Sequence, residues 1–167
     1  MIGLLTVLAA LQAASQPVTA SGAFVDASGA EVGTVGLTQL PSGVLINARL
    51  EGVPPGAHGF HLHTTGRCEP GEGFGTAGGH LSAGMTHGLA TRGGPHPGDM
   101  PNAYVGEDGV LEVSVLNTRV ALEGDRGTPL LDRDGTALLI HSGADDHRSQ
   151  PSGDAGERIA CAVIERD

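Results

Sequence analysis

The chain has 167 residues, which is enough for one domain with a substantial core and too few to argue for two. Its 28 glycines, 10 prolines and lack of tryptophan indicate a turn-rich protein with an aliphatic core, in which long helices are not expected. The formal net charge is -10 and the basic residues are not clustered, so the composition argues against nucleic-acid binding.

The first predicted element is an apolar leader. Residues 2–14 are almost uninterruptedly apolar, and Val18, Thr19 and Ala20 follow as a small-residue cleavage context. This pattern is typical of a secretory signal peptide, because the run is shorter than the ~18 residues of a membrane-spanning helix. We therefore expect residues 1–20 to be a signal peptide with an approximate cleavage site and residues 21–167 to be the mature domain. The mature protein is expected to lack a membrane anchor and to be extracytoplasmic, in the periplasm, the cell envelope or the medium.

Short segments with β-strand character follow the leader and alternate with turn residues. The predicted strands are 22–26, 31–39, 44–50, 59–63, 110–117, 137–141 and 159–164. Clusters such as Pro54-Pro55-Gly56 and Glu107-Asp108-Gly109 separate them. This pattern predicts an all-β fold, a sandwich or barrel built from antiparallel hairpins.

Two long segments show no regular periodicity. Residues 64–102 are rich in glycine, proline and histidine, and residues 142–157 form a second irregular stretch. A compact domain rarely carries such a loop without a function, and bound metal could order the first loop in place of secondary structure. We expect both to be functional loops.

The histidines form a pattern that suits metal binding. His61 and His63 alternate with Phe60 and Leu62, so on a strand both imidazoles would share one face while the apolar side chains face the core. Two ions with four ligands each need eight ligand bonds, and seven residues suffice if one imidazole bridges the ions. The seven candidates are His61, His63, His80, His87, His96, Asp99 and His141.

The two cysteines, Cys68 and Cys161, lie far apart in an apparently exported chain. This favours one intramolecular disulfide, with free thiols or zinc ligands as the alternatives.

Widely separated motifs occur together in a characteristic order. They are His58-Gly59-Phe60-His61-Leu62-His63, Ala77-Gly78-Gly79-His80, Gly94-Pro95-His96-Pro97-Gly98-Asp99 and Gly156-Glu157-Arg158-Ile159-Ala160-Cys161. Across nearly the whole chain after the leader, they resemble copper/zinc superoxide dismutases, and the bacterial secreted branch is the most similar. The resemblance implies a Greek-key antiparallel β-sandwich or flattened barrel of about eight strands with two long functional loops, an architecture that general fold surveys also assign to this enzyme.

The resemblance also implies a role for each candidate ligand. Copper, one ion per subunit, would be held by His61, His63, His80 and His141. Zinc, one ion per subunit, would be held by His80, His87, His96 and Asp99, with His80 bridging the ions and exchanging a proton during catalysis. The seven-residue interval from His80 to His87 is one residue shorter than in the family pattern.

Three further positions follow from the same resemblance. Asp145 would accept hydrogen bonds from one copper ligand and one zinc ligand, whereas the alternative is a solvated loop charge. Arg158 would guide and hold the superoxide anion, whereas the alternative is a surface ion pair with Glu157 or Asp154. His58 matches a structural position, and His147 matches none, so His147 is expected to be a solvated side chain.

The implied activity is the conversion of superoxide into dioxygen and hydrogen peroxide. The main alternative is a noncatalytic copper-binding or copper-delivery protein on the same scaffold, which would tolerate loss of a copper ligand or of Arg158. A zinc-stabilised interaction module is a third hypothesis, but it leaves His61, His63 and His141 without a role. A homodimer is compatible with these motifs, which do not distinguish it from a monomer.

Overall fold

The structure is a computed structural model that describes residues 16–167, so the apolar run of the predicted leader lies outside the described residues. The first strand, β1 (Thr19–Asp26), already includes Thr19 and Ala20. Ala20 is buried and pairs with Leu37 on one side and Arg166 on the other. A cut after Ala20 would therefore remove two residues of this strand, and the approximate cleavage site stays a prediction.

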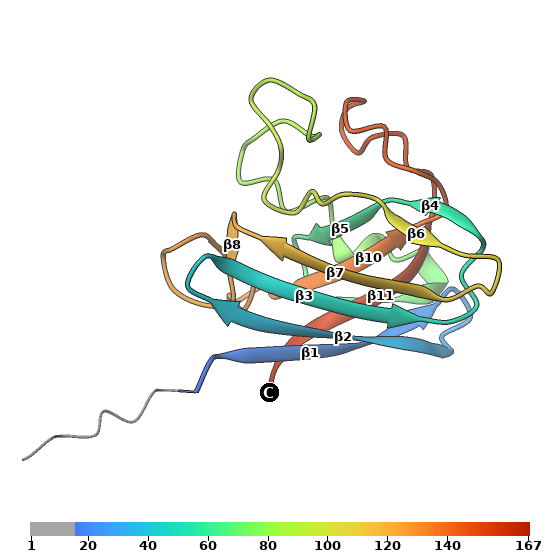
Figure 1. Cartoon of the computed structure of the whole chain (residues 1–167), viewed down its shortest axis with the longest axis horizontal. Coiled ribbons are helices and arrows are strands. Elements are labelled where there is room, and N and C mark those ends of the chain that lie inside the picture. The colour runs from blue at the N-terminus through green and yellow to red at the C-terminus, as the bar shows by residue number, and fades with distance from the viewer. Residues whose placement is uncertain (1–15) are drawn as a thin grey trace, which may run out of the picture.

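Nine of the strands in residues 16–167 form one antiparallel sheet in the order β4-β6-β7-β3-β2-β1-β11-β10-β5. Strands β4 and β5 lie at opposite ends of this order although only Gly59 separates them in the chain, so the sheet curls into a nearly closed barrel (Figure 1). β8 and β9 form a separate parallel pair. Besides β1, the strands are β2 (Glu31–Leu40), β3 (Gly43–Leu50), β4 (Gly56–His58), β5 (Phe60–His63), β6 (Ala103–Val105), β7 (Leu111–Asn117), β8 (Val120–Ala121), β9 (Thr128–Pro129), β10 (Thr136–His141) and β11 (Arg158–Arg166).

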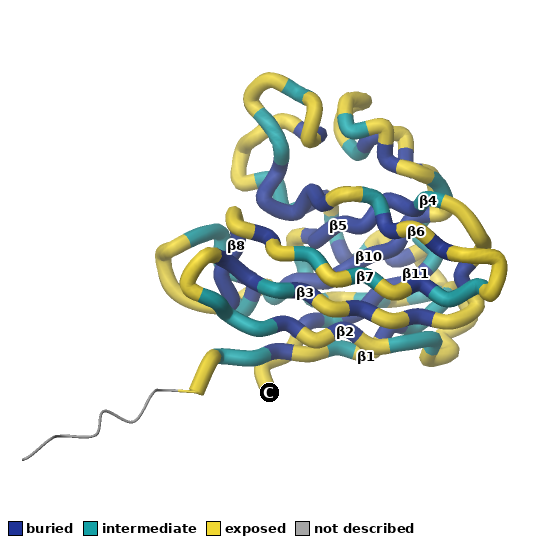
Figure 2. Tube along the Cα trace, in the orientation of Figure 1, coloured by how far each residue is buried: buried dark blue, intermediate teal, exposed yellow. Residues whose placement is uncertain are grey.

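The core follows from the two-residue period of the strands. In β3, Val44, Ile46 and Leu50 are fully buried, whereas the intervening Asn47 and Arg49 are exposed. Each such aliphatic side chain contributes about 1.5–3 kcal/mol on burial. Figure 2 shows this alternation of buried and exposed positions along β1, β2 and β3. The all-β prediction is therefore confirmed.

The seven predicted strands all exist, with ends that differ by up to three residues. The sequence did not reveal β4, β6, β8 and β9, which have only two or three residues each and are too short for a periodic pattern. The loop 64–102 contains two short 3-10 turns, η1 (Pro70–Glu72) and η2 (Gly75–Ala77). No helix among the described residues is long and apolar enough to cross a membrane.

The free edge of β5 is covered by the loop that follows it. Leu62 N donates to Gly98 O at 3.0 Å, and Leu81 N donates to Leu62 O at 2.8 Å. The bridges His61↔Asp99 and His63↔His80 continue this pairing. The loop therefore extends the sheet beyond β5 and places His80 and Asp99 beside the two histidines of the strand.

Candidate metal centre

The first cluster consists of four imidazoles from three parts of the chain. His61 and His63 come from β5, His141 ends β10, and His80 comes from the loop, and all four are buried. One ligand atom from each lies within 4.8 Å of the others.

In each of these four rings, one nitrogen has a partner and the other has none. His61 Nε2 donates to Asp145 Oδ2, His63 Nδ1 donates to Gly78 O, and His141 Nδ1 donates to Gly156 O, at 2.8, 3.0 and 3.3 Å. The unpartnered buried atoms are His61 Nδ1, His63 Nε2, His80 Nε2 and His141 Nε2. Buried polar atoms normally find a partner, and four imidazole nitrogens are a donor set that suits copper.

Burial keeps three of these imidazoles, those of His61, His63 and His141, neutral, as metal ligation requires. Burial lowers the pKa of His61 from 6.5 to about 4, although the hydrogen bond to Asp145 partly opposes the shift. Burial likewise lowers the pKa of His141 to about 3 and that of His63 to about 2. The unpartnered nitrogens of His61, His63 and His141 therefore carry free lone pairs at neutral pH.

The second cluster surrounds one carboxylate oxygen. Asp99 Oδ1 lies 3.1 Å from His80 Nδ1, 3.0 Å from His87 Nδ1 and 3.3 Å from His96 Nδ1. Asp99 Oδ2 accepts hydrogen bonds from Gly88 N at 2.8 Å and His96 N at 2.9 Å. Three imidazoles and one carboxylate with no open position match a structural zinc site.

The charge of Asp99 is stabilised within this second cluster. Burial alone would raise the pKa of Asp99, but hydrogen bonds from His80, Gly88 N and His96 N hold it well below its ordinary value. The carboxylate is therefore ionised and available as an oxygen ligand.

His80 belongs to both clusters, with Nδ1 beside Asp99 and Nε2 unpartnered on the side of the first cluster. Its ring centroid lies 4.1 Å from that of His61. An imidazole that binds two ions must lose both ring protons, which is feasible only with a cation on each side. The position of His80 fits a bridging ligand.

Asp145 connects the two clusters from outside. Its Oδ2 accepts from His61 Nε2 at 2.8 Å and its Oδ1 accepts from His87 Nε2 at 3.0 Å. Asn102 fixes the Asp145 backbone through Nδ2 to the carbonyl oxygen at 2.9 Å and through Oδ1 from the backbone N–H at 2.8 Å. Asp145 is buried, so it is not the solvated loop charge considered as the alternative.

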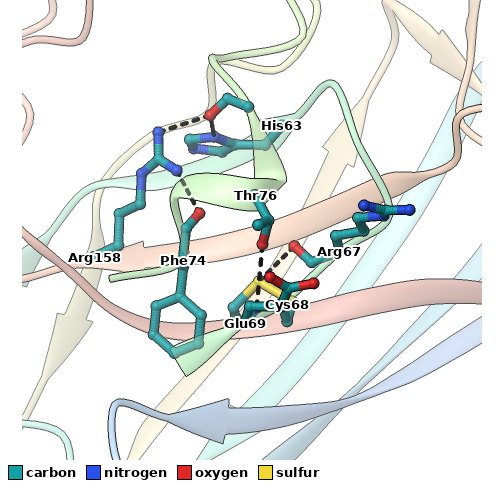
Figure 3. The surroundings of a disulfide bond; sticks show 9 residues. His63, Arg67, Cys68, Glu69, Phe74, Thr76 and Arg158 are labelled. Carbon is teal, nitrogen blue, oxygen red and sulfur yellow. Dashed lines mark hydrogen bonds between the residues drawn. A yellow bond between two sulfur atoms is a disulfide. The ribbon is translucent and has the colours of Figure 1, made fainter. Parts of the chain in front are cut away.

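Arg158, the first residue of β11, is aimed at the same region. Its Nη1 donates to Phe74 O at 2.6 Å and its Nη2 donates to Gly78 O at 2.7 Å (Figure 3). Among residues 16–167 the side chain forms no ion pair with Glu157 or Asp154, so the surface pairing considered as the alternative is absent.

The model of the family described as "Copper/zinc superoxide dismutase (SODC)" matches residues 31–164. The chain belongs to the copper/zinc superoxide dismutase family. It is 44% identical over 152 residues to "Superoxide dismutase [Cu-Zn] 2" of Aquifex aeolicus, covering 90% of this chain and 88% of that protein. It is 40% identical over 139 residues to "Superoxide dismutase [Cu-Zn]" of Caulobacter vibrioides, covering 81% and 79%.

Two solved structures show the same fold. A SOD-like protein from Bacillus subtilis superposes with a TM-score of 0.81 at 33% identity, covering 87% of this chain and 97% of that one. The Cu/Zn superoxide dismutase from Brucella abortus gives a TM-score of 0.70 at 28% identity, covering 88% and 99%. The barrel is therefore that of the copper/zinc superoxide dismutase family.

The predicted disulfide between Cys68 and Cys161 is confirmed, which rules out the free thiols and zinc ligands considered as alternatives. It joins the first loop to β11, the strand that begins with Arg158. Beside it, Phe74 is fully buried against Ala137 and Leu139. The disulfide and Phe74 thus anchor the segment whose carbonyl oxygens hold Arg158 (Figure 3).

Two histidines, His58 and His147, lie outside the clusters and differ in burial and in their contacts. His58 is buried, with Nδ1 2.7 Å from His141 O and Nε2 2.8 Å from Pro54 O, as expected of a structural residue. The expectation that His147 is solvated was wrong. Its side chain is only 25% exposed, and its Nδ1 lies 3.3 Å from Asp145 Oδ2. No local pattern could have indicated this, because the contact depends on the path of an irregular loop.

Proposed function

We propose that this chain catalyses the dismutation of superoxide with a copper ion held by His61, His63, His80 and His141. A zinc ion would be held by His80, His87, His96 and Asp99. The observation that carries this proposal is the pair of buried clusters that share His80, in which five ring nitrogens have no hydrogen-bond partner.

The net reaction converts two superoxide anions and two protons into one dioxygen and one hydrogen peroxide. When bound, copper supplies the one-electron redox chemistry and zinc supplies a fixed positive charge. His80 is placed to hold a proton at Nε2, on the side of the first cluster, while Nδ1 remains in the second cluster. It can therefore pass a proton to the reduced substrate without leaving its position.

The remaining side chains orient this machinery. Asp145 and Gly78 O fix the tautomers of His61 and His63, so that the opposite nitrogens face the ion. Arg158 would bind the anion beside copper. In a chain with a net charge of -10, a local positive field is needed to attract an anionic substrate.

We also propose that processing removes the apolar segment before β1 and that the mature domain works outside the cytoplasm. The disulfide supports this location, because such bonds persist in oxidising compartments. The absence of a membrane anchor from the mature protein stays a prediction. A homodimer and a monomer are both compatible with the sequence motifs, and analytical ultracentrifugation of the mature protein distinguishes them.

The alternative, noncatalytic copper binding or delivery, is less favoured. Such a protein would have no need of Arg158 or of a complete set of four imidazoles, and this chain has both.

The test combines metal analysis with an activity assay. The purified mature protein should contain one copper and one zinc per chain and consume superoxide rapidly. His63→Ala should lose copper and most of the activity while retaining zinc. Stoichiometric copper and zinc in a wild-type protein that does not dismute superoxide would refute the enzymatic function and favour the alternative.

A further inference from the structure

The backbone of His87 is held by one side chain from the other functional loop. Gln150 Oε1 accepts a hydrogen bond from His87 N at 3.0 Å, and Gln150 Nε2 donates to His87 O at 2.9 Å. The same Nε2 donates to Arg148 O, also at 2.9 Å. A single primary amide therefore pairs with both backbone groups of one residue.

The residues on either side of His87 are held by other groups, since Gly88 N donates to Asp99 Oδ2 at 2.8 Å and Thr86 N donates to Gly93 O at 3.2 Å. Residues 81–98 contain no helix and no strand. Among the described residues, no group other than Gln150 hydrogen-bonds to His87 N or His87 O. Gln150 therefore satisfies both backbone groups of His87 itself.

The ring of His87 is fixed separately from its backbone. Nε2 donates to Asp145 Oδ1 at 3.0 Å, while Nδ1 lies 3.0 Å from Asp99 Oδ1. Asp145 and Gln150 both belong to the segment 142–157, so one loop holds His87 by its ring and by its main chain. A ligand usually has to lie within about 0.5 Å of its productive position, and such precision requires support beyond the ligand itself.

The chemistry of the contact is specific for glutamine. The pairing needs one acceptor for the N–H and one donor for the carbonyl oxygen, and a primary amide offers both. A glutamate would keep the acceptor but would place a carboxylate oxygen against His87 O. An alanine would leave both backbone groups to water.

We infer that Gln150 is a positioning residue for the zinc site, acting through the main chain of His87. The inference rests on the proposed ligation of zinc by His87. Because Gln150 lies in the second loop, zinc binding and the ordering of residues 142–157 are thermodynamically linked, and each favours the other. The second loop thereby takes part in holding an ion to which it contributes no ligand.

The test measures zinc binding without superoxide. Metal-free protein with its disulfide intact is titrated with Zn²⁺ against a chromophoric chelator. The variants Gln150→Ala and Gln150→Glu should raise the zinc dissociation constant by about 10–100-fold, the usual effect of losing a group that supports a metal ligand. Zinc should also protect the amides of residues 146–153 from hydrogen exchange in wild type, and markedly less in these variants.

Gln39→Ala is the matched control. Gln39 makes the same kind of contacts, since Nε2 donates to Leu40 O and Gly43 O and Oε1 accepts from Leu122 N, at 2.8, 3.1 and 2.7 Å. None of these partners belongs to residues 81–99 or 142–157. This variant should lose stability but change the zinc dissociation constant by less than about threefold, well below the effect of a lost ligand support.

The outcomes separate this inference from the proposed function. If wild type binds zinc tightly and Gln150→Ala binds it equally well, water replaces the amide and the inference is overturned. An equal weakening in Gln39→Ala would also overturn it, because the effect would then be general destabilisation. If wild type itself binds no zinc, or if His87→Ala binds it as wild type does, the proposed metal centre fails and the inference fails with it.

Discussion

Arg158 Nη2 and His63 Nδ1 share one acceptor, the carbonyl oxygen of Gly78, at 2.7 and 3.0 Å. The guanidinium that would bind the substrate and an imidazole that would bind copper are thus positioned by the same peptide group. The backbone of the first loop therefore sets the position of the Arg158 guanidinium relative to the His63 ring.

Replacing Arg158 should separate substrate attraction from metal binding. Arg158→Ala is expected to retain copper and zinc but to lower the rate constant about tenfold or more, because steering by a local positive field has that order of effect. Its rate should also depend less on ionic strength. Stopped-flow measurements at several salt concentrations check this, with Arg158→Lys as a control that keeps the charge. Kinetics identical to wild type would remove Arg158 from the mechanism.

A methyl group at Gly153 should break the connection between the two clusters. A Cβ there would overlap Asp145 Oδ1 and lie 2.7 Å from His87 Nε2. Gly153→Ala should therefore bind zinc at least about tenfold more weakly, as expected when the partner of a ligand is displaced. Gly153 has φ +70°, so Gly52→Ala, at φ +73° with open space around it, controls for backbone strain. Equal zinc affinity in the two variants would contradict the predicted displacement.

The metal-free protein should lose stability in mild acid. The unfolded histidines titrate near 6.5, whereas burial lowers the pKa of His61 to about 4, that of His141 to about 3 and that of His63 to about 2. Between pH 6.5 and about 4 the unfolded state therefore takes up protons that the folded state does not. Each ring should lower the free energy of unfolding by up to about 1.4 kcal/mol per pH unit.

Urea unfolding of the metal-free protein between pH 8 and pH 5, followed by circular dichroism, measures this dependence. The metal-loaded protein is the control, since its imidazoles remain ligated and its stability should persist to lower pH. A metal-free protein whose stability is the same at pH 7 and pH 5 would show that the folded rings titrate normally.

Removing the disulfide should affect stability and also the support of Arg158. Cys68 and Cys161 are 93 residues apart, and loss of a native bridge typically costs about 2–5 kcal/mol. The Cys68→Ser/Cys161→Ser double variant should unfold at lower urea concentration. It should also show a lower rate at full metal occupancy, because the segment that contains Phe74 O and Gly78 O loses its attachment to β11. A destabilised variant with the wild-type rate per copper would show that Phe74 alone anchors this segment.

The parts of the site that the sequence revealed are those with a local cause. The alternation of Phe60, His61, Leu62 and His63 places ligands and core residues on opposite faces through strand geometry alone. The disulfide was likewise accessible from the number of cysteines and the apparent export of the chain.

The contacts that the sequence did not reveal depend on where irregular backbone passes in space. Gln150 reaches His87 across 63 positions of the chain, and Asn102 reaches Asp145 across 43. No periodic sequence pattern links a single glutamine or asparagine in an irregular loop to a partner so far away in the chain. The short strands β4 and β6 were missed because three residues are too few for a periodic pattern, and residues 56–58 and 103–105 pair with each other across the chain.

The pairing of Leu62 in β5 with Leu81 and Gly98, and of the following Thr64 with Gly79, restricts how the first loop can change in length. These residues cover an edge of the sheet that would otherwise be free to pair with a strand of another molecule. An insertion or deletion among them would shift the pairing register along β5. It would also displace the candidate metal ligands His80 and Asp99, which lie beside that strand. Length variation is therefore tolerated best between Ser82 and Thr86 and between Leu89 and Gly93, which pair with no strand. The seven-residue interval between His80 and His87 includes the first of these two stretches.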